Sequence, residues 1–86
     1  MAIRPKRWSL GDETDKFKIY HYEAPEDSSS GLWIDIRWSK ATLLFTRIRS
    51  NALGQGEWIR FDPPQANFAV AKRRAFELVA RVAVPI

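Results

Sequence analysis

Residues 62–83 read DPPQANFAVAKRRAFELVARVA, and this stretch decides the fold that the sequence predicts. Its pattern is that of an amphipathic helix. Asp62 is the predicted N-cap, because an aspartate carboxylate accepts hydrogen bonds from the unpaired N–H groups of a first helical turn. Pro63 and Pro64 fit that first turn, where a missing N–H costs nothing. We expect the helix to end before Pro85, which cannot continue it.

One face of this helix is apolar. At 100° per residue the apolar stripe consists of Phe68, Ala71, Ala75, Leu78, Val79 and Val82. The opposite face carries Arg73, Arg74, Glu77 and Arg81, at spacings that allow ion pairs with the glutamate. Lys72 falls within the stripe, so that it either extends its amine to water or marks where the stripe ends against a groove. Such a helix needs a flat apolar partner.

The preceding residues predict a sheet that supplies this partner. Alternation of apolar and polar residues indicates strands at 17–23, 32–38, 41–49 and 57–61. Short connections between them favour an antiparallel meander. The face expected to seat the helix carries Phe17, Ile19, Leu32, Ile34, Ile36, Trp38, Leu44, Ile48, Ile59 and Phe61. The register of 41–49 is ambiguous, because both of its faces begin apolar and a bulge would shift it.

The predicted fold is therefore α+β, a four-stranded antiparallel meander followed by one C-terminal helix packed on one sheet face (ββββα). It forms a single domain over residues 17–86, preceded by an arm over residues 1–16 that is first basic and then acidic. A chain of 86 residues is short for covering both faces of a sheet, and we expect a homodimer.

Composition argues against several functions. The chain has no cysteine and one histidine, His21, which leaves no disulfide, thiolate zinc site or catalytic thiol. No apolar run approaches the ~18 residues of a membrane span, and the first residues lack the apolar stretch of a signal peptide. We expect a cytoplasmic, non-catalytic binding protein that uses no metal or cofactor and does not bind membranes.

The second sheet face carries the candidate site. If the registers hold, it displays Lys18, Tyr20, Tyr22, Trp33, Arg37, Phe45, Arg47, Arg49, Trp58 and Arg60. Aromatic rings offer stacking platforms for unpaired bases, and the neighbouring basic side chains can hold phosphates. The net charge of +4 also favours an acidic partner. Asp35 is the one acidic residue expected among them.

Two interpretations of this face stay open. The first is binding of single-stranded DNA or RNA. The second is a protein-interaction module, such as a small regulator or inhibitor that docks an acidic protein surface, because aromatic residues and arginine are also typical of protein interfaces. The rings could equally be buried in a dimer or against the N-terminal arm, with the arginines at the rim.

The order of four strands and one helix over residues 17–84 resembles that of the PUR-repeat, Whirly and positive-cofactor-type coactivator proteins. The similarity lies in the order of elements only, because the matching stretch Leu-Trp-Ile-Asp-Ile-Arg at residues 32–37 is too short to identify a family. The resemblance implies a sheet that binds single-stranded DNA or RNA, and single-repeat members that dimerise. It assigns no binding residue to this chain.

Overall fold

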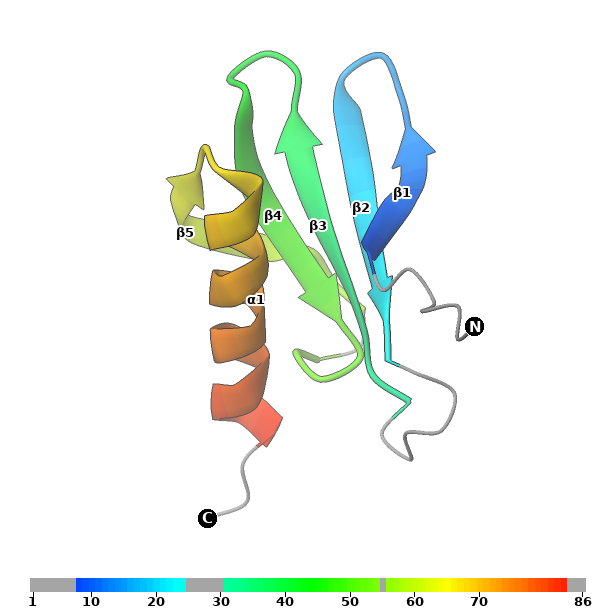
Figure 1. Cartoon of the computed structure of the whole chain (residues 1–86), viewed down its shortest axis with the longest axis vertical. Coiled ribbons are helices and arrows are strands. Elements are labelled where there is room, and N and C mark those ends of the chain that lie inside the picture. Colours follow the sequence, from blue (N-terminus) through cyan, green and yellow to red (C-terminus); the bar gives the residue numbers. More distant parts are fainter. Residues whose placement is uncertain (1–7, 25–30, 55, 84–86) are drawn as a thin grey trace, which may run out of the picture.

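Five antiparallel strands and one helix make up the computed structural model, which describes residues 8–24, 31–54 and 56–83 (Figure 1). The elements are β1 (Trp8–Glu13), β2 (Phe17–Glu23), β3 (Trp33–Ser39), β4 (Leu44–Ser50), β5 (Ile59–Gln65) and α1 (Phe68–Ala83). The strands lie in the order β1-β2-β3-β4-β5, so the sheet is a meander. Helix α1 packs on one face of the sheet against β3, β4 and β5.

The meander has one strand more than the four that the sequence predicts. Strand β1 lies within residues 1–16, which were expected to form an arm. It pairs with β2, with Trp8 opposite Tyr22. A bulge at Gly11 interrupts the ladder, which breaks the two-residue alternation by which a strand is recognised in a sequence. The basic start of the predicted arm, residues 1–7, lies outside the described residues.

The helix begins later than predicted. Strand β5 includes Asp62 and both prolines, which an edge strand tolerates because one of its sides needs no N–H donor. The N-cap is Asn67, whose side-chain oxygen accepts a hydrogen bond of 3.1 Å from the backbone N–H of Val70. The helix then runs from Phe68 to Ala83.

The helix packs its predicted apolar stripe against the sheet. The residues of the stripe that contact the core are Phe68, Ala71, Ala75, Leu78 and Val79. The side chain of Val82 lies outside the described residues. Lys72 extends over a ring of this stripe, with its Nζ 4.6 Å from the centroid of Phe68. The amine thus remains at the surface while the stem follows apolar surface.

The predicted inward residues of β3 form the centre of the core. Ile34 and Ile36 are fully buried, together with Ile48 of β4 and Phe61 of β5. These four side chains lie under the small residues of α1, which allow the helix to approach the sheet closely.

Strand β2 coincides with the predicted strand but has the opposite phase. Tyr20 and Tyr22 face the helix, where Tyr20 lies 4.7 Å from Phe68 between ring centroids. Phe17, predicted to face the helix, lies instead under the guanidinium of Arg37, 4.1 Å from it. Apolar residues occupy both faces of this strand, so alternation alone does not set its phase.

A second bulge reverses the predicted direction of Phe45. Arg37 pairs with Arg47, and the next residue along β3, Trp38, pairs with Phe45, which leaves Thr46 as the extra residue. Phe45 is consequently 3% exposed and stacks on a ring of the helix. This is the register shift that the sequence left open for residues 41–49.

Candidate functional site

The sheet face opposite α1 carries the candidate site, and we call it the open face. Cross-strand pairing and side-chain alternation place on it Phe17, Ile19, His21, Trp33, Asp35, Arg37, Arg47, Arg49 and Arg60, and ring contacts add Trp58. The face therefore combines four arginines with aromatic rings drawn from β2, β3 and the segment before β5.

The open face contains six of the ten residues predicted for the site. They are Trp33, Arg37, Arg47, Arg49, Trp58 and Arg60. Tyr20, Tyr22 and Phe45 pack towards the helix instead, for the reasons of register given above. Lys18 lies on that same side, with its Nζ 5.4 Å from the ring centroid of Trp38. The predicted site loses three rings and one cation, and gains Phe17 and His21.

Three arginines form a row across the sheet. Arg47 of β4 lies directly opposite Arg37 of β3 and also directly opposite Arg60 of β5. Adjacent strands are ~4.8 Å apart, so the row starts from backbone positions within about 10 Å. Like charges at directly opposed positions destabilise a sheet. None of the three has an ion-pair partner among the residues that the structure describes.

Arg37 of this row lies over two aromatic rings. Its guanidinium lies 4.1 Å from the ring centroid of Phe17 and 5.1 Å from that of Trp58. Its Nε is buried and has no hydrogen-bond partner within the described chain. Burial lowers the pKa of Arg37, and the positive charges of Arg47 and Arg49 lower it further. A bound anion would relieve both the crowding of charge and the unpaired donor.

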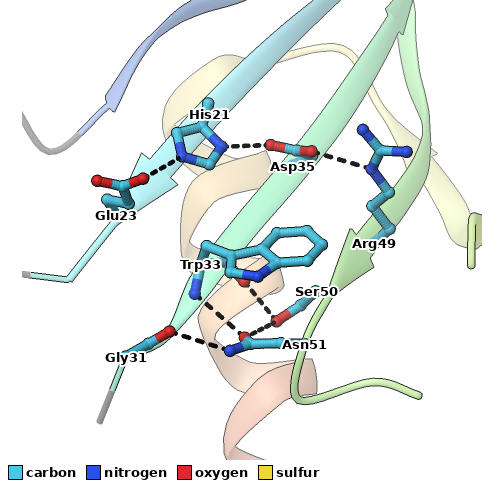
Figure 2. A network of polar contacts seen from close by, with 8 residues as sticks. All are labelled: His21, Glu23, Gly31, Trp33, Asp35, Arg49, Ser50 and Asn51. Atoms are coloured by element: carbon cyan, nitrogen blue, oxygen red, sulfur yellow. Dashed lines mark hydrogen bonds and ion pairs between the residues drawn. The ribbon is translucent and has the colours of Figure 1, made fainter. Parts of the chain in front are cut away.

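A second row, beside the first, is held together by a carboxylate. His21, Asp35 and Arg49 occupy directly opposed positions on β2, β3 and β4. The Nδ1 of His21 lies 2.6 Å from Asp35 Oδ1, and Arg49 Nε donates to Asp35 Oδ2 at 2.9 Å (Figure 2). Asp35 is only 6% exposed, and its charge is matched by these contacts.

The histidine of this row lies between two carboxylates. Its Nε2 is 3.2 Å from Glu23 Oε1. Partial burial lowers the pKa of His21, but hydrogen bonds and charge interactions with Asp35 and Glu23 outweigh it and raise the pKa above its usual value. With both ring nitrogens engaged, His21 orients side chains around it and stacks beside Trp33, whose ring centroid is 6.5 Å away.

The two tryptophans of the open face are held differently. Trp58 lies under two guanidinium groups. The Cζ atoms of Arg49 and Arg37 are 4.4 and 5.1 Å from the centroid of the Trp58 ring. The backbone of Trp33 is fixed by its neighbours, because its N–H donates to Asn51 Oδ1 and its carbonyl accepts from Ser50 Oγ (Figure 2). Trp33 is half-buried. Trp58 thus orients guanidinium groups, while Trp33 offers a positioned ring.

The described residues hold no group of three or more histidine, aspartate or glutamate side chains that could bind a metal ion. No helix among them is long and apolar enough to cross a membrane. Comparisons with protein-family models, with curated proteins and with solved structures found no match to this chain. A functional proposal therefore rests on the geometry of the open face.

Proposed function

We propose that this protein binds single-stranded nucleic acid on its open face and acts by binding, without catalysis. The observation that carries the proposal is the row of Arg37, Arg47 and Arg60, which concentrates positive charge on adjacent strands without acidic partners in the described chain. Such a row suits phosphate groups, because each phosphate that an arginine neutralises releases counterions condensed on the nucleic acid.

Aromatic rings beside the row favour an unpaired strand over a duplex. Trp33 and Phe17 flank the charged region along β3 and β2. Bases are free to stack on rings only when they are not paired, and a flat sheet has no helix or ribbon that enters a groove of a duplex. The open face therefore suits a strand whose phosphates follow the arginines and whose bases meet the rings.

We also propose that the protein is a homodimer, on an observation from the other side of the sheet. Leu10 is 52% exposed and Phe76 is 37% exposed, near the half-buried Trp8 whose ring centroid is 6.1 Å from that of Phe76. A two-fold axis brings the same patch of both copies together, so an apolar patch can cover itself. This interface leaves the open face free.

Trp fluorescence titrated with a short single-stranded oligonucleotide at two salt concentrations tests the proposed function. We expect quenching that weakens as salt rises, and weaker binding of a duplex of the same sequence. If the oligonucleotide gives no response while an acidic protein surface binds through Arg47 and Arg60, the open face is a protein interface and the proposal is wrong.

A further inference from the structure

The bulge in β1 shapes one corner of the open face. Leu10 pairs with Tyr20 and Asp12 pairs with the adjacent Ile19, so Gly11 is an extra residue. In an unbroken strand, Asp12 would share the side of Leu10, towards the helix. The bulge instead brings Asp12 level with Ile19 on the open face, since an inserted residue re-aims the side chains that follow it.

The absent side chain of Gly11 leaves room at the same corner. A Cβ at this position would lie 3.2 Å from the Cβ of His21 and 3.4 Å from the carbonyl oxygen of Ile19. An open hollow of about 310 Å³ is lined by Ser9, Gly11, Asp12, Ile19, His21, Asp35 and Arg49. This volume is at the lower end of small-ligand sites, and it matches one flat heterocycle better than a larger ligand.

The two rims of the hollow differ in chemistry. On the β1 rim, Asp12 Oδ1 accepts from the backbone N–H of Glu13 at 2.8 Å, and its Oδ2 has no hydrogen bond within the described residues. On the opposite rim, Arg49 uses its Nε for Asp35, and its two Nη nitrogens make no hydrogen bond to any residue that the structure describes. The hollow thus has a carboxylate acceptor on one side and a bidentate guanidinium donor on the other.

We infer that this hollow binds a guanine base of the single strand, an inference that rests on the proposed function. Guanine presents the acceptors O6 and N7 on one edge, to which arginine donates two hydrogen bonds, and N–H donors on its pairing edge, which a carboxylate accepts. Arg49 starts on β4, three strand spacings or ~14 Å from β1, and its side chain reaches back to Asp35 on β3. This leaves space for a base lying over Ile19 and His21 between Asp12 and the end of Arg49.

The other bases fit these rims less well. Thymine has carbonyl oxygens on either side of one N–H, and these repel the carboxylate of Asp12. Adenine places an unprotonated ring nitrogen beside its amino group, so it offers the carboxylate one donor where guanine offers two. Cytosine has a single amino donor and a ring too small to span both rims.

Affinities of labelled single-stranded DNA oligonucleotides test this inference. An all-thymine strand is compared with strands that carry one central guanine, adenine or cytosine. The guanine strand should bind about tenfold more tightly than the other three. Asp12→Asn should abolish this preference without weakening binding of all-thymine. The matched control is Asp15→Asn, which removes the same charge at an exposed residue outside the hollow and should keep the preference.

The outcomes separate the two claims. Equal affinity for all four strands, or an unchanged guanine preference in a folded Asp12→Asn protein, overturns the guanine site but leaves the proposed function standing if all-thymine binds with salt dependence. Absence of binding by every strand overturns both. A thermal melt of each variant confirms that Asp12→Asn, at an exposed position, has not unfolded the sheet.

Discussion

Arg37 carries its charge between the rings of Phe17 and Trp58 and beside Arg47 and Arg49. Guanidinium remains protonated under such conditions because its ordinary pKa lies far above neutral pH, so the crowding is not relieved by loss of a proton. Stacking on rings offsets part of the cost and fixes the plane of the group. At the scale of residues, Asp35 therefore neutralises Arg49, while Arg37, Arg47 and Arg60 have no ion-pair partner among the described residues.

Trp33 provides the most direct test of stacking. If a base stacks on its ring, Trp33→Ala should weaken binding of a single-stranded oligonucleotide by ~1–3 kcal/mol. Trp33→Phe retains a ring and should lose less. Fluorescence anisotropy with a labelled oligonucleotide measures both. Full affinity of a folded Trp33→Ala protein would show that this ring is not a stacking platform.

His21 should make stability depend on pH. Its pKa in the folded protein lies above the unfolded value near 6.5, because Asp35 and Glu23 favour the imidazolium more than burial opposes it. The resulting stabilisation is fully present below pH ~6.5 and is lost as pH rises through the raised folded pKa. Urea denaturation measures the free energy of unfolding of the wild type and of His21→Asn across this range. The difference between the two should shrink as pH rises. A difference that grows with pH would contradict the network.

Single residues also show where sequence reasoning reaches its limit. Ile34 and Ile36 were predicted inward because polar residues alternate with them, and both are fully buried. Tyr20 and Tyr22 were predicted outward and are not, because β2 carries apolar side chains on both faces. The second row was not foreseen, since His21, Asp35 and Arg49 meet only once the strands are in register.

The start of α1 illustrates the same limit for a whole element. Asp62 and Asn67 both satisfy the local rules for an N-cap, so the sequence around them does not distinguish between the two. Pairing between β4 and β5 selects Asn67 as the N-cap. It extends to Phe45 opposite Gln65, so Asp62 and the two prolines belong to the sheet. By contrast, the apolar stripe of α1 was predictable, since a 3.6-residue period sustained over a long segment is typical of an amphipathic helix and of no other regular element.

Substitutions at the observed N-cap, Asn67, and at the predicted one, Asp62, should differ in their effect on the free energy of unfolding. Asn67→Ala removes the acceptor for the N–H of Val70 and should lower the free energy of unfolding by ~1 kcal/mol. Asp62→Ala, at an exposed position of β5, should change it little. Urea denaturation of the two variants measures the difference. A larger loss for Asp62→Ala would mean that the helix begins where the sequence alone places it.

On the scale of the whole molecule, the two sides of the sheet have different chemistry. The helix side holds the core and the exposed Leu10 and Phe76, while the open face holds four arginines and Asp35. The order of elements was predictable except for β1, whose bulge at Gly11 hides its alternation. A homodimer formed through the helix side would cover the exposed apolar residues and leave the charged open face accessible to a ligand.

Sedimentation equilibrium tests the dimer. The wild type should be dimeric at micromolar concentrations, and Leu10→Asp should shift it towards monomer, because the change places a charge in an apolar interface. Leu10 is 52% exposed in the single chain, so the substitution should leave the thermal melt of the monomer nearly unchanged. A wild type that stays monomeric at high micromolar concentration would rule out this assembly.

The salt dependence of oligonucleotide binding tests the central claim, that the arginine row of the open face holds phosphates. Arg47→Ala and Arg60→Ala should each flatten the slope of log K against log salt by ~0.7 and weaken binding of all sequences alike. Arg73→Ala removes the same charge from an exposed position on α1 and should leave the slope unchanged. Equal flattening by all three substitutions would mean that net charge alone attracts the strand, and would contradict a binding site on the open face.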